Sequence, residues 1–175
     1  GPLFGLDTRL RPYGEQGLLA SSLDSFNNYQ TNEAWTWEHF ALCRARPVYG
    51  TEAARLRLDA MVKAVLTMPR DQVKLTQDAV KMRQDIAKHK PPKTDLDVKL
   101  ISGGLVDLEF AIHLNQLRFG KGLEPPLEQA LLALAMEGIM PDDAVECYRL
   151  LGRMLVVLRL VAPDNLTPSP AAHSV

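Results

Sequence analysis

The stretch of the chain most suggestive of chemistry lies near its start and combines a carboxylate, two arginines and two glycines. It reads Leu6-Asp7-Thr8-Arg9-Leu10-Arg11-Pro12-Tyr13-Gly14-Glu15-Gln16-Gly17. Guanidinium groups bind phosphate oxygens through paired hydrogen bonds, and glycines allow a backbone to approach a ligand closely. On a strand, Asp7, Arg9 and Arg11 would point to one face. The segment therefore predicts a site where metal and phosphate meet, or else a surface Asp and arginines that pair with nearby carboxylates.

A second block lies roughly ninety residues further on and contains adjacent glycines at the expected start of a helix. It reads Lys99-Leu100-Ile101-Ser102-Gly103-Gly104-Leu105-Val106-Asp107-Leu108-Glu109-Phe110. Gly103 and Gly104 could expose backbone N–H groups to a phosphate, helped by the helix dipole, or could simply begin the helix. Lys99 is open to the same two interpretations, a phosphate contact or a surface charge.

Asp107 and Glu109 interrupt an otherwise apolar run, and they lie about 200° apart around a helix, so they cannot both face one ligand. Unpaired buried carboxylates are costly, which predicts a cationic partner, with Arg44 or Arg46 as candidates. We expect a structural clamp between this helix and the helix containing Glu38. Glu109 also shares a face with His113 and Gln116, a potential polar network.

A third block lies between these two, Glu33-Ala34-Trp35-Thr36-Trp37-Glu38-His39-Phe40-Ala41-Leu42-Cys43-Arg44-Ala45-Arg46. With all three in order, the chain from about Phe4 to about Leu160 resembles the bacterial glutamine synthetase adenylyltransferases, also called glutamate–ammonia-ligase adenylyltransferases. The resemblance implies a helical bundle that follows a nucleotidyltransferase palm. It also implies transfer of AMP from ATP to a tyrosine of glutamine synthetase, with the reverse phosphorolysis in a second half of the protein. The amino-acid sequence of the third block favours the C-terminal half of such a protein, the half that adds AMP.

In enzymes of that family, two Mg²⁺ ions are held by three carboxylates, and Asp7 matches the third of them, in Asp-x-Arg-Leu-Arg-Pro. The resemblance makes Asp7 the catalytic and metal-binding residue, with Arg9, Arg11, Lys99, Gly103 and Gly104 as nucleotide contacts. No Gly-Ser…Asp-x-Asp element precedes Asp7, and Asp95-Leu96-Asp97 is interpreted as a decoy. The chain also lacks an initiator Met, so we expect a piece of a longer enzyme, inactive by itself.

The resemblance names glutamine synthetase as a partner, and the PII signal protein as a regulator of the full-length enzyme. Two alternatives stay open, the helical portion of a PII uridylyltransferase and a non-catalytic helical module that binds glutamine synthetase or a regulator. A net charge of −1 over 175 residues produces no large electrostatic field, so nothing indicates binding to nucleic acid or to an anionic membrane surface. No apolar run approaches the ~20 residues of a membrane span, and no signal peptide is evident, which predicts a cytoplasmic protein.

The periodicity predicts a mainly α-helical fold with three parts, a palm remnant over 1–21, a helical bundle over 22–162 and a flexible tail over 163–175. The remnant is expected to form a strand near 3–10 and a hairpin arm near 18–20, and an orphan strand could pair two copies. Helices are expected near 22–30, 32–46, 54–65, 71–86, 105–119, 127–137 and 141–161, with a short extended stretch near 97–101. Core positions are predicted for both cysteines and for Trp35, Trp37 and Phe40.

Overall fold

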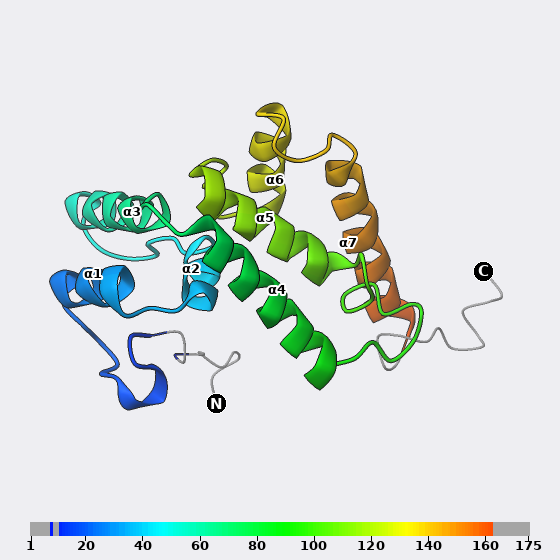
Figure 1. The fold of residues 1–175 in the computed structure, drawn as a ribbon, viewed down its shortest axis with the longest axis horizontal. Helices are drawn as coiled ribbons and strands as arrows, with labels where there is room; N and C mark the ends of the chain where they lie inside the picture. Colours follow the sequence, from blue (N-terminus) through cyan, green and yellow to red (C-terminus); the bar gives the residue numbers. More distant parts are fainter. Residues whose placement is uncertain (1–7, 9–10, 163–175) are drawn as a thin grey trace.

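The computed structural model describes residue 8 and residues 11–162, and these residues form seven α-helices and one short 3-10 helix. The elements are η1 (Gly14–Gln16), α1 (Leu23–Asn32), α2 (Thr36–Leu42), α3 (Glu52–Leu66), α4 (Gln72–His89), α5 (Leu105–Phe119), α6 (Leu127–Met136) and α7 (Ala144–Val161). The predicted mainly α-helical class is confirmed. Figure 1 shows α1 and α3 side by side at one end, α4 and α5 across the middle with α6 above α5, and α7 toward the other end.

Local capping signals set most helix ends where the sequence predicted them. The Ser22 hydroxyl accepts from the Ser25 N–H at 3.1 Å and begins α1, and the Asp71 carboxylate accepts from the first turn of α4. Side-chain oxygens at these positions satisfy N–H groups that the helix itself leaves free. At the other end of α5, Gly120 takes a left-handed conformation with φ of 62°, which favours glycine.

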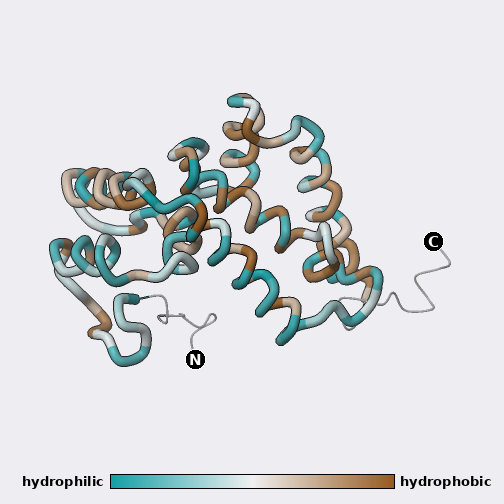
Figure 2. The backbone as a smooth tube through the Cα atoms, viewed as in Figure 1, coloured by the Kyte–Doolittle hydropathy of each residue, from teal (hydrophilic) through white to brown (hydrophobic). Residues whose placement is uncertain are grey.

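Two hydrophobic clusters meet along α5, which is the central element of the fold. One cluster joins α2, α3, α4 and α5 around Phe40, Cys43 and Leu117. The other joins α5, α6 and α7, and its Ile112 and Leu131 side chains are fully buried. Figure 2 shows hydrophobic positions along α5, α6 and α7. Because α5 packs against both clusters, every residue from 105 to 117 is buried or half-buried.

The helix expected over 32–46 is much shorter in the structure, and α2 keeps only its middle. Trp35 precedes the first turn of α2, and its backbone N–H donates to the Glu38 carboxylate at 2.8 Å. Trp35 is 72% exposed and Trp37 45% exposed, so their predicted core positions were wrong, whereas Phe40 is buried as expected. Seven residues of helix bury a single face, and Trp35 lies outside that helix.

Other departures lie where turns replace the regular structure that the sequence suggested. Residues 18–20 form bends and coil rather than a hairpin arm, and Leu18 and Leu19 are exposed. Residues 97–101 are turns, because the N–H groups of Leu100 and Ile101 fold back onto the Asp97 carbonyl. In α3, Ala54 is exposed, Leu58, Met61 and Val62 are half-buried, and Val65 and Leu66 at the end of the helix are buried.

The strand expected near 3–10 lies almost wholly outside the described residues, as does the tail expected over 163–175. The division of the chain into palm remnant, bundle and tail stays a prediction. Within residue 8 and residues 11–162, none of the helices has the length and apolarity needed to cross a membrane.

Candidate functional site

Arg11 closes the turn that follows the Asp7 motif. Its Nη1 donates to the Thr8 carbonyl at 2.7 Å, its Nε to the Gly17 carbonyl at 3.2 Å, and its Nη2 to the Glu15 carbonyl at 3.2 Å. Gly17 is required there, because a Cβ at this position would lie 1.9 Å from the Pro12 carbonyl oxygen. Asp7 and Arg9 lie outside the described residues, so the metal and phosphate roles of the motif stay predictions.

Tyrosine side chains connect this turn to the helices. The Tyr13 hydroxyl donates to the Glu33 carboxylate at 3.0 Å, and its ring packs edge-on against Tyr29 with 4.7 Å between centroids. The Tyr29 hydroxyl in turn donates to Glu38 Oε1 at 2.9 Å. Burial and the bond to Glu38 raise the pKa of Tyr29, so this phenol stays protonated. The turn is thereby linked through α1 to the start of α2.

Glu38 consequently works between α1 and α2 rather than in the predicted clamp to α5. Its Oε1 accepts from Tyr29, and its Oε2 accepts from the N–H of Trp35. This cap fixes the first turn of α2. The expected clamp joined the helix containing Glu38 to the helix containing Asp107, with Arg44 or Arg46 as the cation, and among the described residues Glu38 accepts from Tyr29 and Trp35 instead.

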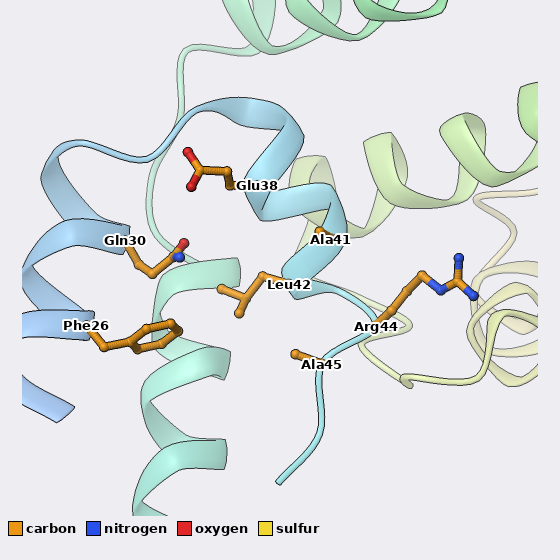
Figure 3. A pocket seen from close by; sticks show the side chains of 7 residues that line it. All are labelled: Phe26, Gln30, Glu38, Ala41, Leu42, Arg44 and Ala45. Atoms are coloured by element: carbon orange, nitrogen blue, oxygen red, sulfur yellow. The ribbon is translucent and has the colours of Figure 1, made fainter. Parts of the chain in front are cut away.

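A cavity of about 440 Å³ opens between α1 and α2, beside Glu38. Figure 3 shows the residues that line it, which are Phe26, Gln30, Glu38, Ala41, Leu42, Arg44 and Ala45. Its walls are mainly apolar, with one carboxylate, one guanidinium and one amide. Gln30 is 6% exposed, and its Oε1 has no hydrogen-bond partner among the residues that the structure describes. A buried acceptor without a donor is uncommon in native proteins.

The backbone of Gln30 is held by a buried histidine that the sequence gave no reason to single out. His39 Nε2–H donates to the Gln30 carbonyl at 2.8 Å, and His39 Nδ1 accepts from Arg70 Nη1 at 2.8 Å. Burial lowers the pKa of His39, and the Arg70 charge lowers it further, which keeps the ring neutral. Arg70 also donates to the Val65 carbonyl at 2.7 Å, so one guanidinium connects α2 to the end of α3.

Asp107 has a cationic partner, but it is Arg83 of α4 and neither Arg44 nor Arg46. Arg83 Nε forms an ion pair with Asp107 Oδ1, and Asp107 Oδ2 accepts the Gly103 N–H at 2.6 Å. The predicted partners were wrong because α4 runs along α5 and brings Arg83 beside the first turn of α5. The clamp on α5 therefore exists, and it joins α5 to α4.

The backbone N–H groups at the start of α5 already donate to acceptors within the protein. Gly103 donates to Asp107, Gly104 to the Ile101 carbonyl at 3.0 Å, and Val106 to the Lys99 carbonyl at 3.1 Å. The exposed Lys99 side chain lines a separate cavity between α4 and α5. The other residues that line this cavity are Asp85, Ile86, His89, Lys90, Leu100 and Val106. The phosphate role of Lys99, Gly103 and Gly104 stays a prediction.

Glu109 lines a further cavity of about 410 Å³ between α2, α4 and α5, together with Arg44, Trp37, Asp85 and His113. Among the described residues no ion pair joins Glu109 to Arg44. His113 Nδ1–H donates to Gln116 Oε1 at 2.8 Å, which confirms that part of the predicted network. Burial lowers the pKa of His113. Arg46 is exposed at a different cavity, beside Pro47.

No group of three or more His, Cys, Asp or Glu side chains that could hold a metal ion occurs within the part of the chain that the structure describes. Asp97 is buried and accepts from the Leu100 N–H at 3.3 Å, so it stabilises a turn. Cys43 is buried, and burial raises its pKa to about 12, as expected for an inert core thiol. Cys147 is exposed, so its predicted core position was wrong.

The amino-acid sequence of the chain is similar to that of known proteins. The sequence profile described as glutamate-ammonia ligase adenylyltransferase matches residues 1–61. The bifunctional glutamine synthetase adenylyltransferase/adenylyl-removing enzyme of Brucella suis biovar 1 (strain 1330) is 40% identical over 171 residues, which is 94% of this chain and 17% of the relative.

Proteins of the same description from two other bacteria show a similar relation. That of Agrobacterium fabrum (strain C58) is 38% identical over 98% of this chain and 18% of the relative. That of Mesorhizobium japonicum is 50% identical over 71% of this chain and 13% of the relative. The chain thus spans less than a fifth of the length of these relatives. By sequence, it belongs to the glutamate–ammonia ligase adenylyltransferase family.

Proposed function

We propose that this chain is the helical segment next to the catalytic palm of a glutamine synthetase adenylyltransferase, in a protein as long as its relatives. The reaction moves AMP from ATP to a tyrosine of glutamine synthetase: the phenolic oxygen forms a bond to the α-phosphorus, pyrophosphate leaves, and the phenolic proton is released. Identity of 40% over 94% of the chain is the observation that supports this proposal most.

Asp7 is the proposed catalytic carboxylate. A phenol with an ordinary pKa of about 10 is a poor nucleophile at neutral pH, so its attack needs a metal ion or a base. Asp7, the first residue of the Asp-x-Arg-Leu-Arg-Pro motif, would share Mg²⁺ with carboxylates from other segments of the longer protein. The described residues offer no metal-ligand group of their own, so we assign them no step at the metal.

The described residues have a positioning role in this proposal. The guanidinium of Arg11 fixes the turn after Asp7, and Tyr13 and Tyr29 connect that turn to Glu38. The bundle would therefore hold the Asp7 motif at a fixed distance from the α1–α2 cavity. Arg9, Arg11, Lys99, Gly103 and Gly104 are the proposed nucleotide contacts, although the N–H groups of Gly103 and Gly104 would have to exchange their present acceptors.

The regulatory and cellular context follows from family membership and is also a proposal. We propose that the longer protein works in the cytoplasm, responds to the PII signal protein and also removes AMP by phosphorolysis in its other half. The sequence Glu-Ala-Trp-Thr-Trp-Glu-His at 33–39 favours an assignment of this chain to the AMP-adding half of the longer protein. Pairing of two copies through the N-terminal segment stays a prediction that gel filtration can test.

Mass spectrometry of glutamine synthetase tests the reaction class. The full-length protein, Mg²⁺ and ATP should add one AMP to a tyrosine of glutamine synthetase, and phosphate should reverse the modification. A module that only binds glutamine synthetase would form a complex and leave the tyrosine unmodified. That second result would contradict the proposed activity.

A further inference from the structure

The outer face of α7 carries residues at the spacing of one side of a coiled coil. Glu146, Leu150, Arg153, Val157 and Leu160 follow one another at alternating intervals of four and three residues, and all of them are exposed. Side chains at this spacing form a single seam along a helix, and such seams pack against each other when two helices pair. These residues form the α7 seam.

The α7 seam exposes apolar surface that the fold of the chain does not bury. Leu150 is 52%, Val157 54% and Leu160 80% exposed. The other side of α7 already packs against α5 and α6, and Figure 1 shows α7 toward the edge of the molecule. All seam residues except Leu160 line an open groove of about 1270 Å³. Because contiguous exposed apolar surface commonly marks an interaction site, a partner is expected on this face.

The charges of the seam restrict that partner. Glu146 and Arg153 lie seven residues apart, and among the described residues neither forms an ion pair. In a parallel pair of α7 helices, each charge would face its own copy and be repelled. In an antiparallel pair, Leu150 packs beside the second copy's Arg153, and Val157 beside its Glu146. Each Arg153 guanidinium then lies about one helical turn from a Glu146 carboxylate of the other copy.

We infer that the α7 seam binds a second copy of this chain, with the two α7 helices side by side and antiparallel. The contact is isologous, so the same residues serve both copies. The aliphatic part of Arg153 covers Leu150 of the other copy while its charged end pairs with Glu146. Stable complexes bury about 1,200–2,000 Å² in total, and two short helix faces bury little by comparison, so the dimer dissociates on dilution. The inference concerns association of this chain and does not depend on AMP transfer.

Sedimentation velocity over a range of concentrations tests the apolar part of the contact. The mass should be close to 19.4 kDa at about 1 μM and should rise toward twice that value at several hundred μM. Leu150→Lys removes apolar surface and places a cation beside Arg153 of the other copy, so it should weaken association at least about tenfold. Leu56→Lys on α3 is the matched control, since Leu56 is 61% exposed, and it should change nothing.

Charge reversal tests the orientation of the two helices. Arg153→Glu and Glu146→Arg should each weaken association about tenfold, and the two changes together should restore it to within about threefold of the wild type. Arg55→Glu, at an exposed position of α3, alters the net charge as Arg153→Glu does and should leave association unchanged. Circular dichroism should show wild-type helix content for every variant.

Three results would overturn the inference. The first is a monomer at every concentration, which would mean that another partner or another segment covers the seam. The second is a dimer that Leu150→Lys and the single reversals leave intact, as expected if two copies pair through the N-terminal segment. The third is a double reversal that fails to restore association, which would exclude the antiparallel contact of Glu146 with Arg153.

Discussion

The Tyr29 hydroxyl of α1 donates a 2.9 Å hydrogen bond to Glu38 Oε1, and this contact joins α1 to the first turn of α2. Glu38 also accepts the Trp35 N–H with its other oxygen, at 2.8 Å. A single carboxylate thus fixes the start of one helix and its distance from another. The α1–α2 cavity and the turn containing Arg11 both depend on this arrangement.

Tyr29→Phe should lower the free energy of unfolding by about 1 kcal/mol, because it removes one hydrogen bond to a charged acceptor and keeps the buried ring. Urea denaturation followed by circular dichroism measures the change. Tyr49→Phe is the control, since Tyr49 is 95% exposed, and it should change stability by less than about 0.5 kcal/mol. Equal effects of the two changes would mean that the bond to Glu38 contributes nothing.

Asp107→Ala should destabilise the protein by about 2–3 kcal/mol, because it leaves the half-buried Arg83 without its anion and the Gly103 N–H without its acceptor. A double-mutant cycle with Arg83→Met isolates the pair and should give a coupling of about 1–2 kcal/mol. The Asp24–Arg57 pair is the matched control, with side chains 87% and 63% exposed. Its coupling should stay below about 0.5 kcal/mol, and a larger value there than for Arg83–Asp107 would contradict the structure.

Gly122→Ala should cost far more stability than Gly138→Ala, although both glycines have positive φ angles of 61° and 68°. A Cβ at Gly122 would lie 2.8 Å from Leu134 Cγ and 2.9 Å from the Ala130 carbonyl oxygen, whereas a Cβ at Gly138 meets nothing within 4 Å. We expect about 1 kcal/mol for Gly138→Ala, from backbone strain alone, and about 3 kcal/mol or more for Gly122→Ala. Similar melting temperatures for the two variants would be inconsistent with this packing.

Stability should decrease as the pH falls below about 6.5, because burial lowers the pKa values of His39 and His113 in the folded protein. Above that pH both rings are neutral in the folded and unfolded states, and their contribution to stability is fully present. Below it the unfolded chain binds protons first, so the free energy of unfolding falls until the folded pKa values are reached.

Urea denaturation between about pH 7 and about pH 5 measures this dependence, and buried carboxylate pairs contribute mainly at lower pH. His113→Asn should reduce the slope in that interval, whatever its effect on stability itself. A slope of the opposite sign would mean that the folded protein stabilises charged imidazolium rings, contrary to the contact of His39 Nδ1 with the Arg70 guanidinium.

Local rules predicted those parts of the fold that depend on near neighbours in the sequence. Helices were predicted to begin near 22, 71 and 105 and one to end near 119, and the structure has helix ends beside each of these positions, where Ser22, Asp71 and Gly120 act on close neighbours. Resemblance to a family identified the chain, and relatives with 37–40% identity over most of its length confirm that assignment.

Contacts between distant segments could not be predicted in this way. Arg83 was missed as the partner of Asp107 because only the packing of α4 on α5 brings them together across 24 residues. The Gln30 cavity was missed because nothing near Gln30 in a polar helix indicates that its amide is buried without a donor. Trp35 and Trp37 were placed in the core by their apolar character, but α2 is too short to bury them.

The rate of AMP transfer by the Asp7→Asn variant of the full-length protein tests the central claim most directly. Labelled AMP from ATP should appear on glutamine synthetase at least about a hundredfold more slowly than with the wild type, because the amide no longer supplies a negative ligand for Mg²⁺. Asp142→Asn, at an exposed position before α7, should transfer AMP at the wild-type rate, and both variants should melt like the wild type. Wild-type transfer by a folded Asp7→Asn variant would place the catalytic carboxylates elsewhere and contradict the account.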